Sequence, residues 1–145
     1  MLSYLMENIS EKLILLPLFY RKLNAEAVAA SGLGSSQLQI LVLLNRMGKL
    51  PMYEIADRIC ISKPNLTPLI DKLCKAGYVD RTPGELDRRV IFVSITGKGM
   101  SCIYGYKQAM TNLLSYQLNK MPIQEQQKLD EAFETIVSAF RSLNE

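Results

Sequence analysis

The sequence predicts a mostly α-helical protein that carries one small β-hairpin. At both ends of the chain, apolar residues recur at three- and four-residue steps, which is the spacing of one helical face. Between residues 78 and 95, two short segments rich in β-branched and aromatic residues flank a charged loop, which is typical of a hairpin. We expect one integrated domain, with helical regions at residues 1–32 and 99–145 around a central region at residues 33–98.

A long first helix is predicted from the N-terminus to Gly32, because glycine often ends a helix. Pro17 lies inside this helix and removes one backbone hydrogen bond, so we expect a bend there. The apolar face of the helix consists of Leu2, Leu5, Ile9, Leu13, Leu16, Tyr20, Leu23 and Ala27.

Three shorter helices are predicted next. The connector at residues 33–36 contains two serines that we expect to cap a helix at residues 37–47. A helix at residues 52–59 and another at residues 64–76 are joined by a tight turn, and Gly77 ends the second of them. A helix, a short turn and a helix that ends on glycine is the arrangement of a helix-turn-helix motif.

The hairpin strands are predicted at residues 78–82 and 90–95 and form a wing beside the helix-turn-helix. Thr96 is expected to cap a fifth helix that runs to about residue 119, and Pro122 to begin a sixth. The sixth helix carries an apolar stripe of Ile123, Leu129, Phe133, Ile136, Val137, Phe140 and Leu143.

The terminal helices carry more apolar surface than so small a body can cover, so we expect them to cover one another in a homodimer. The predicted fold is therefore mostly α with a small β-hairpin wing. It is a winged helix-turn-helix at residues 33–98, flanked by N- and C-terminal dimerisation helices.

The composition is typical of a folded cytoplasmic protein. With 145 residues, 48% hydrophobic and 21% charged, the chain suits one domain and differs from disordered chains. Its longest apolar run, Leu13–Tyr20, is much shorter than the roughly 20 residues that a membrane span requires, so we expect no membrane association. The N-terminus lacks the basic segment of a signal peptide, and three widely spaced cysteines indicate reduced thiols.

The chain contains no histidine, which excludes a Ser-His-Asp triad, a Cys-His pair and histidine-ligated zinc. No phosphate loop or cluster of metal ligands is recognisable, so we expect no enzyme activity, no cofactor and no metal site. The net charge is +3, and residues 58–98 hold eight Lys or Arg against four Asp or Glu. The basic character is therefore concentrated in the predicted helix-turn-helix and wing.

The helix at residues 64–76 has the pattern of a DNA recognition helix. Leu66, Leu69, Ile70 and Leu73 share one face, which leaves the polar groups of the N-terminal end free to reach base edges and phosphates. Pro68 cannot donate a hydrogen bond and should loosen the first turn. The simpler interpretation is a solvated helix face. The candidate major-groove residues are Ser62, Lys63, Pro64, Asn65, Thr67 and Lys72.

At the hairpin tip, Asp87 precedes Arg88 and Arg89, so its carboxylate can hold a guanidinium group extended. An arginine presented in this way suits a narrow minor groove of DNA. The alternative is a surface ion pair worth roughly 0–1 kcal/mol. Candidate phosphate contacts elsewhere are Ser36, Lys75 and Arg81.

Five stretches of sequence form a recognisable set: Ile55–Ile59, Ser62–Leu73, Lys75–Arg81, Asp87–Arg89 and Ser94–Gly99. In this order they resemble the multiple antibiotic resistance regulator (MarR) family, and the resemblance extends over nearly the whole chain. It implies a homodimer whose two recognition helices enter successive major grooves of double-stranded DNA at a roughly palindromic operator. It also implies that Arg89, steadied by Asp87, enters the flanking minor groove.

The resemblance further implies a regulator, most often a repressor, that releases DNA when a small aromatic or phenolic ligand binds between the dimer helices and the winged helix. For any one aromatic side chain, ordinary core or dimer packing is the simpler interpretation. The candidate side chains for such a pocket are Tyr4, Phe19, Tyr20, Tyr53, Tyr104 and Tyr106.

Two alternatives stay open, and the first is a cysteine-based redox-responsive regulator. The hydroperoxide-sensing branch of the family uses a cysteine in the first helix, whereas the cysteines here are Cys60, Cys74 and Cys102. Cys60 adjoins the positive end of the recognition helix, which favours a reactive thiolate, but a small buried hydrophobe is the simpler interpretation. The second alternative is a winged-helix protein-interaction module without specific DNA binding, in which the wing arginines would be replaceable.

Overall fold

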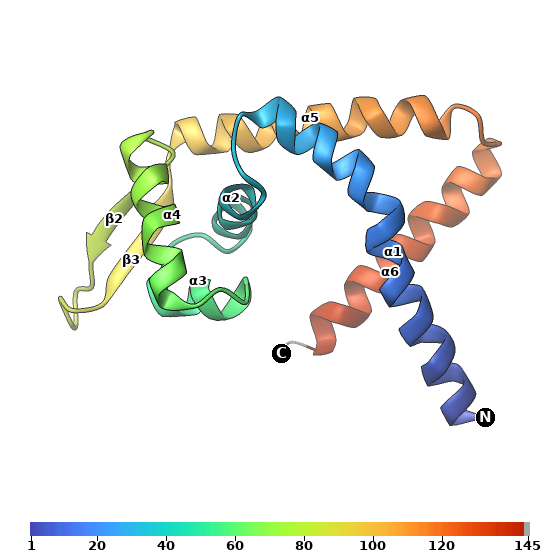
Figure 1. The fold of residues 1–145 in the computed structure, drawn as a ribbon, viewed down its shortest axis with the longest axis horizontal. Coiled ribbons are helices and arrows are strands. Elements are labelled where there is room, and N and C mark those ends of the chain that lie inside the picture. Colours follow the sequence, from blue (N-terminus) through green and yellow to red (C-terminus); the bar gives the residue numbers. More distant parts are fainter. Residues whose placement is uncertain (144–145) are drawn as a thin grey trace. The chain divides into compact units, whose positions relative to one another are not determined.

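The computed structural model describes residues 1–143, and residues 144–145 of the predicted C-terminal region, with the side chain of Leu143, lie outside the described residues. Residues Met1–Met110 form one compact unit, and those from Thr111 onward form a second. The elements are α1 (Leu2–Ser31), α2 (Ser35–Met47), β1 (Leu50–Pro51), α3 (Met52–Arg58), α4 (Lys63–Lys75), β2 (Val79–Pro83), β3 (Ile91–Ile95), α5 (Gly97–Leu118) and α6 (Ile123–Leu143) (Figure 1).

The predicted mostly helical fold with a small hairpin is confirmed, and a glycine follows within two residues of the ends of α1, α2 and α4. Gly32 and Gly77 adopt left-handed backbone angles, with φ of 72° and 77°, which glycine tolerates best. The predicted serine caps of α2 are wrong, because α2 already begins at Ser35. Gly34 is the N-cap residue instead, and its N–H donates to Gln37 Oε1 at 3.1 Å.

The core of the first unit lies between the helix-turn-helix and the sheet. Helix α4 contacts α2, α3 and β2. Of its predicted apolar face, Leu66, Ile70 and Leu73 expose no surface, and Leu69 is half-buried. The buried cluster consists of Leu38, Ile40, Leu41, Leu44, Leu50, Ile55, Leu66, Ile70, Leu73, Val79, Val93 and Ile103.

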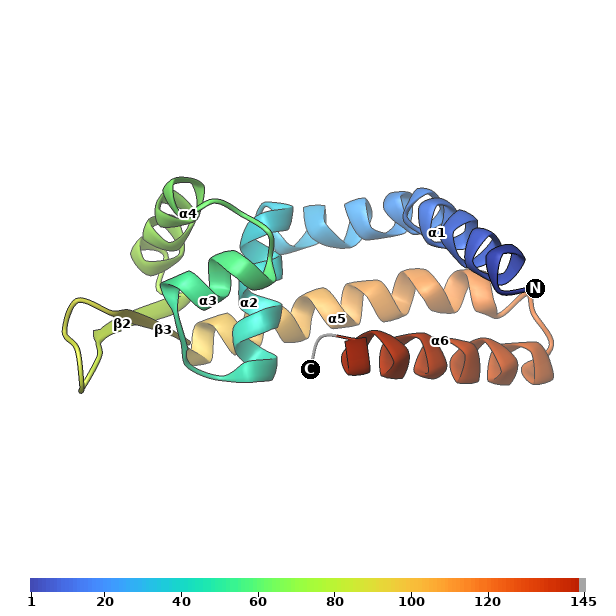
Figure 2. The same cartoon turned by 90° about the horizontal axis from the view of Figure 1, so that it is seen from below.

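The sheet has a third strand that the sequence did not predict. Strand β3 lies in the centre, with β2 antiparallel on one side and β1 antiparallel on the other. Strand β1 has only two residues and pairs Leu50 with Val93, so neither a periodic pattern nor a local turn reveals it. Beyond the helices of the first unit, β2 and β3 project as a hairpin in both views (Figures 1 and 2).

The junctions at the two ends of α5 follow the predicted capping signals. Thr96 Oγ1 accepts the N–H of Gly99 at 3.1 Å, which confirms its role as a cap. In the second unit, the Pro122 carbonyl accepts the N–H of Gln126 at 3.1 Å at the start of α6. Gln126 Nε2 also donates to the carbonyls of Leu118 and Met121, each at 3.0 Å, and so fixes the α5–α6 turn.

The long helices expose much apolar surface. On α1, Leu5 and Ile9 are 58% and 49% exposed, and on α6, Ile123 and Phe133 are 59% and 46% exposed. Within residues 1–143, no single helix is long and apolar enough to cross a membrane. Helices α1 and α2 reach the length and apolar composition of a membrane span only when they are taken together, and they meet at a bend of 84°.

Candidate nucleic-acid interface

Helix α4 presents a polar N-terminal end to solvent. Ser62 is the N-cap residue, and its carbonyl accepts the N–H groups of Asn65 at 2.9 Å and Leu66 at 3.0 Å. The positive end of the helix dipole makes such an end a favourable place for phosphate. All of the candidate major-groove residues are exposed: Ser62, Lys63, Pro64, Asn65 and Thr67 lie at this end, and Lys72 lies in the last turn of α4.

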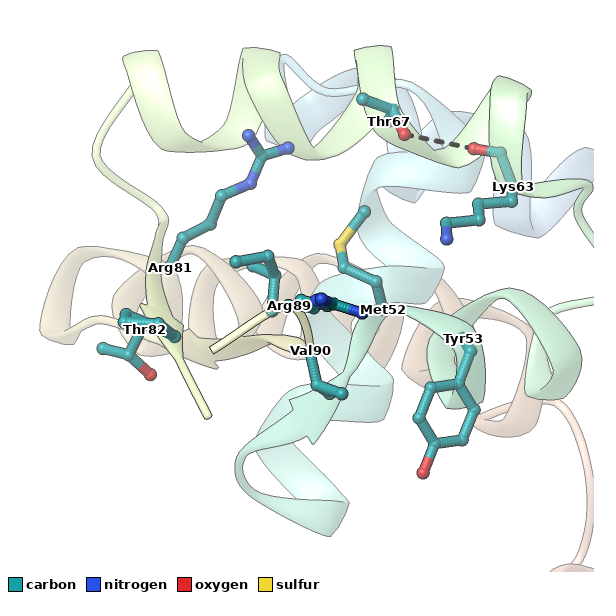
Figure 3. Close-up of a pocket in the computed structure, with 10 residues that line it drawn as sticks. Met52, Tyr53, Lys63, Thr67, Arg81, Thr82, Arg89 and Val90 are labelled. Atoms are coloured by element: carbon teal, nitrogen blue, oxygen red, sulfur yellow. Dashed lines mark hydrogen bonds between the residues drawn. The ribbon is translucent and has the colours of Figure 1, made fainter. Parts of the chain in front are cut away.

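Pro68 does not interrupt α4, although it has no N–H to offer the carbonyl of Pro64. One residue earlier, Thr67 Oγ1 donates to the Lys63 carbonyl at 3.2 Å (Figure 3). A hydroxyl oxygen can still accept hydrogen bonds while it donates one. Thr67 therefore remains able to accept from a base amino group.

A groove of about 420 Å³ lies between α3, the start of α4 and the wing, and we call it the wing groove. Three cations line it, namely Lys63 from α4, Arg81 from β2 and Arg89 from the wing loop (Figure 3). Among the described residues that line the groove there is no carboxylate, so its lining is net positive. The other lining residues are Met52, Tyr53, Thr67, Thr82, Pro83, Val90 and Ile91.

An ion pair connects the wing groove to the recognition helix. Arg81 Nη1 lies 2.7 Å from Asp71 Oδ1, and the two side chains are 34% and 44% exposed. Because Asp71 belongs to α4 and Arg81 to β2, the pair joins helix and wing. Of the candidate phosphate contacts, Arg81 lines the wing groove, whereas Ser36 in α2 and Lys75 in the last turn of α4 do not.

The wing loop holds Arg89 differently from the prediction. Asp87 Oδ1 accepts the backbone N–H of Arg89 at 2.9 Å, so the carboxylate fixes the main chain of the loop. Among residues 1–143, the ion pairs are Arg58–Glu54 and Arg81–Asp71, and the predicted contact between Asp87 and a guanidinium group is not one of them. The short side chain of Asp87 reaches the nearby backbone donor more readily than a long flexible arginine head.

Gly84 closes the same loop. Its N–H donates to the Val90 carbonyl at 2.8 Å, and a Cβ there would lie 2.6 Å from the Asp87 carbonyl oxygen. The tip therefore requires glycine at this position, a requirement that the sequence analysis did not identify. Asp87, Arg88 and Arg89 are all exposed.

A second groove of about 400 Å³ lies between α1, α2 and α5, and we call it the tyrosine groove. Asn24 Oδ1 accepts hydrogen bonds from Tyr20 Oη at 2.8 Å and from Tyr106 Oη at 2.7 Å. Burial, together with the neighbouring Tyr106 hydroxyl, raises the pKa of Tyr20 above its ordinary value, so the phenol stays protonated. The other lining residues are Val28, Ser35, Leu38, Gln39, Val42, Leu43 and Arg46.

Of the six aromatic candidates for a ligand pocket, Tyr20 and Tyr106 line the tyrosine groove. Tyr53 lines the wing groove instead, because α3 carries it on the wing side of the helix-turn-helix. The sequence analysis missed Asn24 and Arg46. The available signal for Asn24 was its position four residues after Tyr20, which places the amide and the aromatic ring on the same helical face.

The three cysteines differ in exposure. Cys60 is exposed, so its predicted burial is wrong. It adopts a left-handed backbone with φ of 54° just after the end of α3, a conformation that is uncommon for a residue other than glycine. Burial raises the pKa of the partly buried Cys74 thiol, against the opposing effect of Arg81, and burial also raises the pKa of Cys102.

Comparison with known proteins agrees with this architecture. Residues 33–91, which span the helix-turn-helix and most of the wing, match the MarR family model. The chain is 30% identical over 106 residues to the HTH-type transcriptional regulator YfiV of Bacillus subtilis, covering 73% of this chain and 66% of YfiV. It is 31% identical over 93 residues to the regulator MhqR of the same organism, covering 62% of this chain and 64% of MhqR.

The chain thus spans just under two thirds of the length of these curated relatives. The crystal structure of wild-type MarR from Escherichia coli superimposes with a TM-score of 0.71 at 18% identity, and the match covers 94% of this chain and 96% of that one. Local sequence and whole-chain fold therefore agree. The chain belongs to the MarR family.

Proposed function

We propose that this chain is a DNA-binding transcription regulator and not an enzyme. The observation that carries the proposal is the convergence of Lys63, Arg81 and Arg89 on the wing groove, beside the exposed N-terminal end of α4. A cationic groove next to a polar helix end suits a DNA phosphate backbone, with the helix in the major groove and the wing beside it. Such a protein works where the chromosome is, so we place it in the cytoplasm.

The proposed DNA-binding form is a homodimer on a pseudo-palindromic operator. Its support is the apolar surface that α1 and α6 expose, since large exposed apolar patches mark interfaces. Two copies related by a twofold axis would present two recognition helices about one helical turn of DNA apart. The commoner outcome of such binding near a promoter is repression.

The experiment compares wild type with Arg89→Ala and with the control Arg21→Ala, which removes an exposed arginine of α1 that lines neither groove. Duplexes are first selected from a random pool, and binding is then measured by fluorescence anisotropy across a salt series, with a scrambled duplex for comparison. We expect Arg89→Ala to weaken selective binding by about tenfold or more and to reduce the salt slope by about one. Arg21→Ala should match wild type.

Equally weak binding to selected and scrambled duplexes, indifferent to Arg89, would contradict the proposal. That result would favour the protein-interaction module. Selective binding that is lost in peroxide and restored by a thiol would favour the cysteine-based redox regulator, and Cys60→Ser would then abolish the response.

We also propose that the tyrosine groove takes a small aromatic effector. Leu38, Val42 and Leu43 supply an apolar wall, and Arg46 supplies a cation at the same groove. This combination suits an aromatic ring that carries an acidic group. A panel of benzoates and phenols, tested for release of the selected duplex with wild type and Arg46→Ala, examines this proposal. An effector should release DNA from wild type and require a higher concentration with the variant.

A further inference from the structure

The C-terminal end of the recognition helix is fastened to the first turn of α5. The N–H of Thr96 donates to the Tyr78 carbonyl at 3.0 Å, and Thr96 Oγ1 donates to the Gly77 carbonyl at 2.7 Å. Lys98 Nζ donates to the Ala76 carbonyl at 2.5 Å. Three consecutive carbonyls that follow α4 are therefore all bound by residues at the start of α5, and we call this set of contacts the α4–α5 clamp.

Lys98 supplies the charged contact of the clamp. Its ammonium group binds a carbonyl at the negative end of the α4 dipole, where a cation is favoured. The same group lies 4.7 Å from the centroid of the Tyr78 ring, within the range of a cation–π contact. A hydrogen bond from an ammonium group is stronger than one between neutral groups. Lys98 thus holds both the helix end and the residue that leads into the wing.

The surrounding backbone leaves the clamp little freedom. Gly77 and Tyr78 donate their N–H groups back to the carbonyls of Cys74 and Leu73, each at 2.9 Å, which closes the end of α4. On the other side, Gly99 is buried, and a Cβ there would meet the Tyr78 carbonyl oxygen and lie 2.5 Å from Ile95 Cγ1. The first turn of α5 therefore packs directly against the exit of the recognition helix.

Small rotations at the clamp become large displacements at the base-reading end. Asn65 and Ala76 are eleven residues apart along α4 and its C-cap, a distance of roughly 16 Å along the axis. A tilt of about 5° at Ala76 would move Asn65 by roughly 1.4 Å, which is enough to break hydrogen bonds to base edges.

We propose that Lys98 is a positioning residue for DNA binding, which acts through the α4–α5 clamp and does not touch DNA. The inference rests on the proposed function, and it adds a route for regulation. Helix α5 also carries Tyr106, which lines the tyrosine groove eight residues after Lys98, or about 12 Å along the helix. A ligand that shifts α5 at Tyr106 shifts the recognition helix through the clamp.

The test uses Lys98→Met, which keeps most of the unbranched side chain and removes the donor, and Lys98→Arg, which keeps a donor. Lys107→Met is the matched control, because it removes the same charge from an exposed position of α5. Binding to the selected and the scrambled duplex is measured over a salt series for each full-length variant. Amide hydrogen exchange is followed in the DNA-free proteins.

We expect Lys98→Met to weaken binding to the selected duplex by about tenfold, with an unchanged salt slope and unchanged binding to the scrambled duplex. Lys98→Arg should restore most of the affinity, and Lys107→Met should match wild type. In the DNA-free protein, Lys98→Met should speed exchange at Gly77 and Tyr78, while Lys107→Met should not. A variant that merely unfolds would lose binding to both duplexes together.

A Lys98→Met protein with wild-type affinity and selectivity would overturn the proposal. A salt slope reduced by about one would also overturn it, because Lys98 would then be a direct phosphate contact. If wild type selects no duplex at all, the proposed function fails, and the exchange measurement alone decides whether Lys98 holds the end of α4. Unchanged exchange at Gly77 and Tyr78 would then refute the clamp.

Discussion

Two glycines begin α5 in different surroundings. Gly97 is exposed, and a Cβ built on it would meet no atom within 4 Å. Gly99 is buried, and a Cβ there would meet the Tyr78 carbonyl oxygen and lie 2.5 Å from Ile95 Cγ1. Neither glycine has a left-handed backbone. The requirement at Gly99 is therefore one of space and not of backbone angle.

Gly99→Ala should lower the free energy of unfolding by about 1–3 kcal/mol, because one of the atoms that must move belongs to the backbone. Gly97→Ala is the control and should be neutral or stabilising by up to about 1 kcal/mol, since alanine favours the helix. Urea unfolding followed by circular dichroism measures both. Equal stability of the two variants would show that α5 and the Tyr78 carbonyl do not pack as described.

Individual side chains show where sequence reasoning ends. The exposure of Ser62, Asn65 and Thr67 followed from the helical period of α4, because the apolar positions fixed which face was buried. The surroundings of Asp87 and Cys60 did not follow, because each depends on a local backbone conformation. The Asp87 carboxylate accepts the N–H of Arg89, and Cys60 adopts a left-handed backbone conformation just after α3.

At the scale of elements, helices were predictable and strand pairing was not. Glycines and Thr96 mark helix ends within a residue or two, because capping is a local matter. Strand β1 and the contact of Asn24 with Tyr106 depend on segments far apart in the chain. The tyrosine groove therefore emerged only from the packing of α1, α2 and α5, which no periodic pattern encodes.

The ion pair between Asp71 and Arg81 joins two elements, and its energy should be modest. Both side chains are about a third or more exposed, so water screens the pair, and coupling energies of about 0.2–1 kcal/mol are typical of such pairs. A double-mutant cycle of Asp71→Ala and Arg81→Ala, measured by urea unfolding, should give about 0.5 kcal/mol in dilute buffer. The coupling should fall toward zero in about 1 M salt.

The control for this cycle is the pair of Glu54 and Arg58, which lie one turn apart within α3 at 2.8 Å and do not join separate elements. Its coupling should be similar or smaller. A coupling of several kcal/mol between Asp71 and Arg81 would contradict the exposed geometry. It would mean that the pair, and not the buried core, fixes the wing against α4.

At the scale of the whole molecule, the apolar side chains divide into two groups. One group is the buried cluster of twelve side chains from the winged region and the start of α5, from Leu38 to Ile103. Those along α1, such as Leu5 and Ile9, stay about half exposed. A stable obligate interface buries well over about 1,000 Å² and is rich in such residues. The winged region therefore contains its own buried core, whereas the apolar face of α1 stays exposed, as the proposed homodimer requires.

A charge on the α1 stripe should separate the copies. We expect wild type to have a mass in light scattering of about twice the 16.4 kDa of one chain, and Ile9→Glu to weaken the dimer at least about 100-fold, because an unpaired carboxylate would be buried. Ser10→Glu is the control, since it adds the same charge to an exposed position beside the stripe. Circular dichroism verifies that both variants fold.

Binding to the selected duplex should fall together with dimerisation in Ile9→Glu, because the second recognition helix then no longer benefits from the first being bound. Ser10→Glu should keep both properties. A wild-type protein that is monomeric at micromolar concentration and still binds the duplex selectively would refute the dimer. In that case the exposed face of α1 would serve another partner, and the operator would contain a single half-site.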